Sequence, residues 1–265
     1  MPFKPNGLVA LLTDFGNKDA YVAVVKARML QVAPTLRFLD ISHEVEPQNI
    51  AQGSFILADA LPWFPDGTVF LAVVDPGVGS DRKSICVWDG KRAFVAPDNG
   101  LLALAARRCG PLKVLELEPD RVPGVERISN TFHGRDLFAP AAAALASGLV
   151  KPADLGSPLP SFQKGKAMAC RNGEGMVLHI DHFGNVITSL QPDALPEDLH
   201  GLQIHDFHIS EQVQFYAQAS PGRLVFLEGA SGFIEISVVG GSAQERLRAK
   251  LGDCVRCITS ETTRH

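Results

Sequence analysis

The sequence predicts two domains: an α/β domain whose mostly parallel sheet is covered by helices, and a smaller all-β domain of sandwich or barrel type. In the first domain, short apolar runs alternate with segments of helical spacing, which is the pattern of strands joined by crossover helices. After Leu159 that alternation ends, and runs with a β-strand signature follow one another between Gly and Pro turns. We therefore expect domains over 1–160 and 171–265, joined by a polar linker over 161–170.

Each strand expected in the first domain is a short apolar run bounded by polar or glycine-containing segments. Asp19 is expected to cap the first helix, Pro34 to stop it, and Pro47 to lie in the first turn of the second helix. The dipeptide Asp89-Gly90 predicts a hairpin turn. The expected strands cover 8–13, 36–41, 68–74, 84–88, 92–96 and 112–117, and the expected helices cover 22–30, 47–60, 101–108 and 134–147.

The second domain is expected to be built from strands alone. Its apolar runs have a β-strand signature, and Gly and Pro turns separate them. The expected strands cover 176–180, 186–190, 213–217, 224–227, 233–239 and 255–259.

Three early apolar runs end on an aspartate: Asp14, Asp40 and Asp75. Ligands bind open α/β sheets at the carboxyl ends of the strands, so these carboxylates are expected to lie along one binding edge. The alternative is that each aspartate caps the helix or turn that follows it. That alternative suits Asp40, but it suits Asp75 poorly, because the glycine-rich loop after it continues to Asp81 and Arg82.

Composition excludes several classes of protein. The 265 residues carry a net charge of −4 and contain no Lys/Arg cluster, which argues against a nucleic-acid-binding protein. The N-terminal residues lack the apolar stretch of a signal peptide, and no run is long enough to cross a bilayer. The five cysteines are odd in number and scattered, so reduced thiols and a cytoplasmic location are expected.

Familiar cofactor and metal motifs are missing or incomplete. Asp14-Phe15-Gly16 matches a kinase tripeptide, but no phosphate-binding glycine loop accompanies it, and no HExxH or GxSxG motif occurs. His179, Asp181 and His182 suggest a metal only weakly, because spacing identifies no third ligand. We expect neither a metal nor a cofactor.

Two polar clusters are candidates for chemistry. In the first, Asp75 and Arg82 share a loop, and His133 precedes a helix between Phe132 and a glycine. A histidine in such a place is a candidate general base, because its pKa lies near neutral pH; the alternative is a structural histidine. The second cluster runs from Asp181 to Asn185, and its alternative is an ordinary Asx turn.

Taken together, these segments resemble the S-adenosyl-L-methionine (SAM) hydroxide adenosyltransferase family, whose relatives include fluorinating and chlorinating enzymes. The resemblance covers most of the chain, in family order. It rests on LLTDFGNKDAYVAVVKARML, DISHEVEPQNIAQGSFIL, VDPGVGSDRK, APDNGLL, TFHGRDLFAPAAAALASG and IDHFGNVITSL, and more weakly on SGFIEISVVGGSA.

The resemblance implies a water-activating set made of Asp75, Arg82 and His133. The halogenating relatives lack this set, so its presence here points to water as the nucleophile. Gln48 stands where the fluorinating enzymes have a tryptophan near the ribose.

The resemblance also assigns substrate contacts. Asp14 corresponds to the carboxylate that holds the ribose hydroxyls, and Phe132 to an aromatic side chain beside the nucleoside. Asp181 corresponds to the group that receives the methionine ammonium. Asn185 corresponds to the amide that reads adenine, and Ser231 to a contact with the methionine carboxylate.

The implied reaction is hydrolysis of SAM to adenosine and L-methionine by attack of activated water on C5′. A sulfonium is already a good leaving group, so the reaction lacks only a nucleophile. A guanidinium beside the water favours its deprotonated form, and a carboxylate-oriented imidazole can take the proton. The resemblance further implies a homotrimer with sites at subunit interfaces. A SAM-dependent halogenase and a non-catalytic SAM- or adenosine-binding module are the alternatives.

Overall fold

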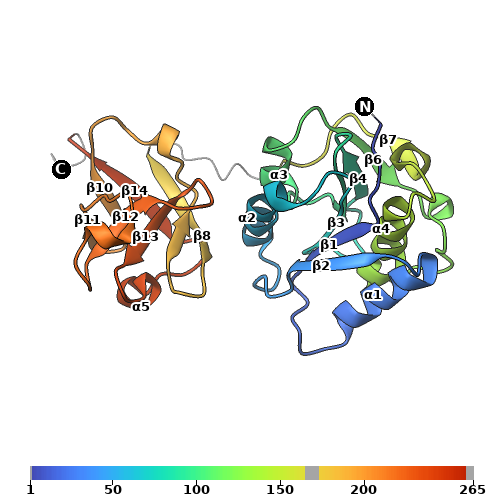
Figure 1. Cartoon of the computed structure of the whole chain (residues 1–265), viewed down its shortest axis with the longest axis horizontal. Coiled ribbons are helices and arrows are strands. Elements are labelled where there is room, and N and C mark those ends of the chain that lie inside the picture. The colour runs from blue at the N-terminus through green and yellow to red at the C-terminus, as the bar shows by residue number, and fades with distance from the viewer. Residues whose placement is uncertain (1, 165–172, 261–265) are drawn as a thin grey trace. The chain divides into compact units, whose positions relative to one another are not determined.

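A computed structural model of the protein describes residues 2–164 and 173–260 (Figure 1). The chain forms two compact units, residues 1–166 and 167–265, and each is considered by itself. The expected linker over 161–170 lies partly outside the described residues, so its bounds stay a prediction. No helix within the described ranges is long and apolar enough to span a membrane.

The first unit is built on a mixed sheet, which in the described residues has the order β2-β1-β3-β5-β4-β6-β7. The half that contains β2, β1, β3 and β5 is parallel, and β4, β6 and β7 add to it in antiparallel fashion. The expected α/β domain is confirmed, and the antiparallel half begins at the expected hairpin. The strands are β1 (Leu8–Thr13), β2 (Arg37–Ser42), β3 (Val69–Val73), β4 (Ser84–Trp88), β5 (Ala93–Pro97), β6 (Lys113–Leu117) and β7 (Gly156–Pro158).

Helices cover both faces of this sheet because its central strands are apolar on both sides. Val9 and Leu11 of β1 join a core with Val25 and Met29 of the first helix, while the alternate residues of β1 face the other way. Figure 1 shows α1 and α4 on one side of the sheet and α2 and α3 on the other. The helices are α1 (Tyr21–Val32), α2 (Ile50–Ala60), α3 (Ala103–Arg107) and α4 (Ala139–Ala146).

Two expected helix starts are wrong, and local geometry explains both. Asp19 does not cap α1, because the N-cap position falls on Ala20, which makes no side-chain cap. Pro47 is not in the first turn of α2, because Gln48 adopts a left-handed backbone with φ 66°. The helix instead begins after Asn49, whose side chain accepts a hydrogen bond from the Gln52 backbone N–H.

The second unit is an antiparallel, nearly closed barrel, which in the described residues has the order β11-β10-β14-β8-β9-β13-β12. A bridge between Gln212 and Phe226 joins the segment after β11 to β12. The expected all-β domain is confirmed, but the strand expected over 213–217 is replaced by irregular chain and a 3₁₀ turn at Tyr216–Gln218. The strands are β8 (Glu174–Ile180), β9 (Val186–Thr188), β10 (Leu199–Ile204), β11 (Phe207–Ile209), β12 (Leu224–Glu228), β13 (Ile234–Val238) and β14 (Cys254–Thr259), with the short helix α5 (Ala243–Leu247).

Candidate active site

Two of the three aspartates, Asp14 and Asp75, lie just beyond the ends of neighbouring strands. Strands β1 and β3 are parallel neighbours, with Thr13 paired to Val73, so Asp14 and Asp75 follow at the same carboxyl edge. Asp40 differs from this pattern: it lies within β2 and binds the Lys26 side chain, 2.6 Å away. The edge predicted from the sequence therefore carries two of the expected carboxylates.

Asp75 and Arg82 form a bidentate ion pair. Arg82 donates from Nε to Asp75 Oδ1 at 2.9 Å and from Nη2 to Oδ2 at 2.5 Å. The two side chains are only 6% and 8% exposed. Because a planar guanidinium matches a carboxylate in one orientation, Asp75 fixes the direction in which Arg82 presents its remaining N–H groups.

Two contacts that the sequence did not reveal complete the surroundings of Arg82. Its Nη1 donates to Ser84 Oγ at 2.7 Å. Its guanidinium carbon lies 5.2 Å from the centre of the Phe138 ring, within range of a cation–π interaction. These contacts hold the guanidinium on several sides, so the Arg82 side chain is fixed in one orientation.

His133 joins this group through Arg82. His133 Nδ1 lies 2.8 Å from Arg82 Nη2. A guanidinium can only donate, so Nδ1 accepts and the neutral ring carries its proton on Nε2. Burial of the ring and the nearby Arg82 charge both lower the pKa of His133. The expected imidazole oriented by a carboxylate is wrong in this respect, because Asp75 orients the arginine and the arginine orients the histidine.

A close backbone approach brings the two loops of this cluster together. Gly79 has φ +80°, and a Cβ at this position would lie 2.4 Å from the Asn130 carbonyl oxygen, so only glycine fits. The first residue of the loop over 129–133 is also fixed, because the Ser129 backbone N–H donates to Asp136 Oδ2 at 2.8 Å. His133 directly precedes a π-helical turn over Gly134–Phe138, a feature frequent at functional sites.

Phe132 connects the histidine loop to the Asp14 loop. Its ring centre lies 5.7 Å from that of Phe15 and 5.3 Å from that of Tyr21. Asp14 Oδ2 accepts a hydrogen bond from the Gln48 backbone N–H at 2.8 Å. The expected residues of the first domain therefore belong to three loops. Aromatic side chains pack the Asp14 loop against the histidine loop, and the Arg82–His133 contact joins the loop from Asp75 to Arg82 to the histidine loop.

In the second domain, Asp181 and Asn185 form a tight Asx turn between β8 and β9. Asp181 Oδ1 accepts the backbone N–H groups of Phe183 and Asn185, and Oδ2 accepts Asn185 Nδ2 at 2.8 Å. Ser231 lies in the turn before β13. Because β9 and β13 are antiparallel, this turn is at the opposite end of the two strands from Asn185, which precedes β9. The structure thus brings two of the three expected residues of this domain into contact with each other.

Sequence analysis missed a buried acid in the same domain. Glu235 Oε1 accepts the Tyr216 hydroxyl at 2.5 Å and the Ser237 hydroxyl at 2.7 Å. Burial, Glu235 and the nearby Asp181 charge together raise the pKa of Tyr216 to about 12. An isolated tyrosine and glutamate 19 residues apart carry no sequence motif, so no pattern pointed to them.

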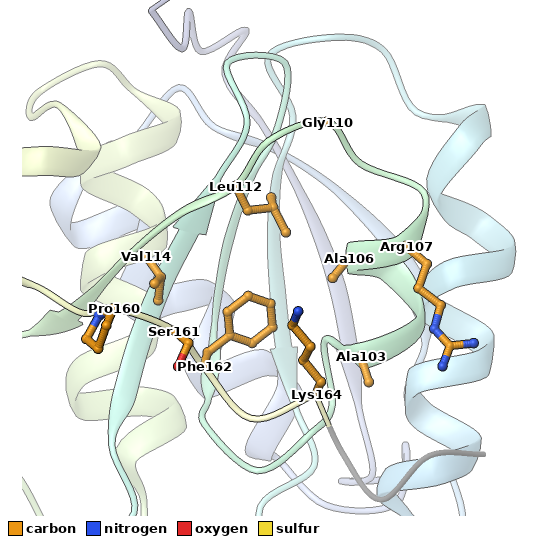
Figure 2. Close-up of a pocket in the computed structure, with 10 residues that line it drawn as sticks. All are labelled: Ala103, Ala106, Arg107, Gly110, Leu112, Val114, Pro160, Ser161, Phe162 and Lys164. Carbon is orange, nitrogen blue, oxygen red and sulfur yellow. The ribbon is translucent and has the colours of Figure 1, made fainter. Parts of the chain in front are cut away.

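A cavity that the structure contains in the first domain lies away from these residues. Within residues 2–164 and 173–260, no group of three or more His, Cys, Asp and Glu side chains is arranged to hold a metal ion, and the expectation of a metal-free site stays a prediction. A cavity of about 440 Å³ lies beside α3 and β6, with Leu112 and Phe162 pointing into it (Figure 2). None of the expected site residues lines it.

Comparison with family models decides the identity of both domains. Residues 9–156 match the N-terminal domain of SAM hydroxide adenosyltransferases, and residues 175–256 match the C-terminal domain. The chain belongs to the SAM hydroxide adenosyltransferase family. The Asp75–Arg82–His133 cluster lies in the N-terminal family domain, and the Asp181–Asn185 turn lies in the C-terminal one.

Relatives with known names and solved structures agree with this membership. The chain is 40% identical over 259 residues to a protein of Thermus thermophilus named (R)-S-adenosyl-L-methionine hydrolase, covering 94% of this chain and 99% of that relative. It is 28% identical over 220 residues to a protein of an Actinoplanes species named fluorinase, covering 72% and 74%. A crystal structure of an uncharacterized conserved protein from Thermotoga maritima matches with a TM-score of 0.84 and 35% identity, covering 94% and 100%.

The contact with Arg82 predicts which ring nitrogen of His133 carries the proton. We expect nitrogen NMR of labelled protein to show the Nε2–H tautomer, with a pKa below the ordinary imidazole value of about 6.5. The acid limb of kcat/KM should then lie below that value too, because protonation of Nδ1 removes the acceptor of the Arg82 hydrogen bond. Replacing Arg82 with methionine should raise the pKa of His133. An Nδ1–H tautomer, or a pKa unaffected by that replacement, would contradict the contact.

Proposed function

We propose that the protein hydrolyses S-adenosyl-L-methionine to adenosine and L-methionine. The observation that carries the proposal is the assembled Asp75–Arg82–His133 cluster, held by bonds of 2.5 to 2.9 Å. It occurs in a chain that matches both domains of the hydroxide adenosyltransferase family. The relatives from Thermus thermophilus and Salinispora tropica that carry the hydrolase name match nearly end to end.

In the proposed reaction, a water-derived oxygen forms a bond to C5′ while the C5′–S bond breaks. The bonding electron pair returns to sulfur, and neutral methionine sulfur leaves without an acid or a Lewis acid. The Arg82 charge favours hydroxide over water nearby. His133 Nδ1 is occupied by Arg82, so we assign its Nε2–H as a donor that orients the nucleophilic oxygen, with the water's proton passing to solvent. Holding the oxygen in line with C5′ supplies the remaining acceleration.

The substrate contacts follow as proposals for individual residues. Asp14 is assigned to the ribose hydroxyls and Phe132 to the face of the nucleoside. Asp181 is assigned to the methionine ammonium and Ser231 to its carboxylate. Asn185 is assigned to the adenine edge, because the bond from Nδ2 to Asp181 leaves its carbonyl oxygen and one N–H for a base.

The products and the origin of the oxygen test the reaction directly. SAM incubated with the protein in oxygen-18 water, chloride and a chelator should give adenosine labelled at its 5′ hydroxyl, together with methionine. Formation of 5′-chloroadenosine would indicate the halogenase alternative, and no turnover would indicate the binding-module alternative. Activity that appears only after a divalent ion is added back would refute the metal-free site.

We further propose that the active enzyme is a homotrimer in which one subunit supplies the first-domain residues and its neighbour the second-domain residues. Head-to-tail contacts can close into such a ring, and pockets are favoured at domain interfaces. The support is chemical: one SAM molecule carries both the C5′ centre assigned to the first domain and the methionine groups assigned to the second.

Mixing two inactive variants tests the shared site. His133→Ala and Asp181→Ala should each be inactive alone. After subunit exchange they should regain partial activity, because some interfaces then combine an intact first domain with an intact second domain. Exchange shown by mass spectrometry without any recovered activity would place the whole site in one chain.

A cytoplasmic location is also part of the proposal. Its support is that the five cysteines are odd in number and scattered along the sequence, as is usual for proteins kept in a reducing compartment.

A further inference from the structure

A buried histidine that the proposed reaction does not use lies directly behind Asp14. His43 follows β2, and only 4% of its surface is exposed. Its Nδ1 lies 2.8 Å from Oγ1 of Thr13, the residue that precedes Asp14. Its Nε2 lies 3.1 Å from Asp40 Oδ1, close enough for an electrostatic contact. Asp40 is shared with the Lys26 ammonium, at 2.6 Å.

The positions of the protons in this chain of side chains are consistent with one another. The Phe15 backbone N–H donates to Thr13 Oγ1 at 3.3 Å, so the Thr13 hydroxyl is free to donate its own hydrogen to His43 Nδ1. A neutral imidazole that accepts at Nδ1 carries its proton on Nε2, the atom that faces Asp40. The contacts from Asp40 through His43 therefore hold the Thr13 side chain in place, and with it the backbone that leads into Asp14.

The segment that begins at His43 also grips the Asp14 loop through three further hydrogen bonds. The Gly16 backbone N–H donates to the His43 carbonyl oxygen at 2.7 Å. Asn17 Nδ2 donates to Glu44 Oε1 at 2.7 Å. The Gln48 backbone N–H donates to Asp14 Oδ2 at 2.8 Å. We call residues 43–48 the clamp, because they contact the Asp14 loop at Asp14, Gly16 and Asn17.

Strained backbone marks the end of the clamp that touches the carboxylate. Gln48 has φ 66°, a left-handed conformation that side chains other than glycine adopt only under constraint. Such strain persists where the surrounding structure holds it, and it gathers at functional sites. Here the strained residue presents the N–H that binds Asp14.

We propose that His43 is a positioning residue for ribose recognition, acting through Thr13 and the clamp to fix the direction of the Asp14 carboxylate. This inference rests on the proposed role of Asp14 and adds the residues that make that role possible. His43 itself does not touch the substrate. Loss of the Thr13–His43 bond should therefore weaken recognition of the ribose hydroxyls and leave contacts with the rest of the nucleoside intact.

Paired substitutions at Thr13 test this with nucleoside binding as the readout. The full-length protein is titrated calorimetrically with adenosine and with 2′,3′-dideoxyadenosine. Thr13→Val should weaken adenosine binding about tenfold, the effect of one ordinary hydrogen bond, and leave dideoxyadenosine binding unchanged. Thr13→Ser keeps the hydroxyl and should stay within about twofold of the wild type for both ligands.

A matched control is Thr68→Val in the same domain. Thr68 is fully buried and donates its hydroxyl to the Pro65 carbonyl oxygen at 2.8 Å, at the opposite end of β3 from Asp75. This variant should lose stability without any change in either affinity. A second pair of variants changes the acceptor of the Thr13 hydrogen bond. His43→Leu removes this acceptor, whereas His43→Asn can keep one, because the asparagine side chain can place an oxygen near the Nδ1 position.

The outcomes separate the inference from the proposed reaction. If Thr13→Val weakens the binding of both nucleosides equally, or if Thr68→Val causes the same loss of adenosine affinity, His43 is only structural and the inference is wrong. If the wild type binds both nucleosides equally, the ribose role of Asp14 fails, and the inference fails with it. Absence of adenosine from SAM would refute the proposed function whatever the binding data show. If the His43 variants do not fold, the Thr13 pair still decides.

Discussion

Arg82→Ala should lower kcat about 10²–10³-fold while KM changes little, because the guanidinium acts on charge that develops at the nucleophile. The same substitution should cost about 3–5 kcal/mol of stability, because it leaves the Asp75 carboxylate buried without its partner. His133→Ala should also lower kcat at nearly constant KM, and it should cost less stability because that ring is only half-buried. Steady-state kinetics and urea unfolding measure the two effects.

The double variant Asp75→Leu/Arg82→Met separates stability from chemistry. Two apolar side chains in place of a buried ion pair should restore much of the unfolding free energy, and kcat should stay low. Arg121→Ala is the matched control, because Arg121 pairs with Glu118 at 2.7 Å on the surface, where such pairs contribute little. Recovery of kcat in the double variant would show that the ion pair only supports the fold. A large change in KM for Arg82→Ala alone would instead assign Arg82 to substrate binding.

Asp14→Ala should damage binding and rate together, with a loss of about 10²–10⁴-fold in kcat/KM. A hydrogen bond to a charged carboxylate contributes about 1.5–3 kcal/mol, and Asp14 is assigned to both ribose hydroxyls. The rate suffers as well as the affinity, because the ribose fixes the position of C5′ relative to the nucleophile.

Asp14→Asn is the informative companion variant. It keeps an oxygen that can accept the Gln48 backbone N–H, so the loop should stay folded, and only the charge and one acceptor are lost. We expect an intermediate effect on kcat/KM. A fall in kcat alone, with KM unchanged in both variants, would instead move Asp14 from substrate binding to the chemical step.

Local sequence patterns were sufficient for most of the first domain, because its strands are apolar runs of ordinary length between glycine and proline signals. They failed where neighbouring residues overrode a local preference. Pro47 is a good first-turn residue, but the left-handed Gln48 that follows it delays α2 to Ile50. The segment 213–217 has a strand-like composition but passes into a 3₁₀ turn at Tyr216, where the tyrosine hydroxyl reaches the buried Glu235.

The sequence by itself determined the family, the two-domain plan and the residue types of the candidate site, because these depend on motifs and periodicity that a linear pattern retains. Only the tertiary structure decided how the site residues contact one another. Asp75 binds Arg82, and Arg82 rather than a carboxylate binds His133, an order that spacing cannot reveal because the loops meet through the contact of Gly79 with Asn130. His43 was invisible in the sequence for the same reason: its role comes from burial and from partners brought to it by strand pairing.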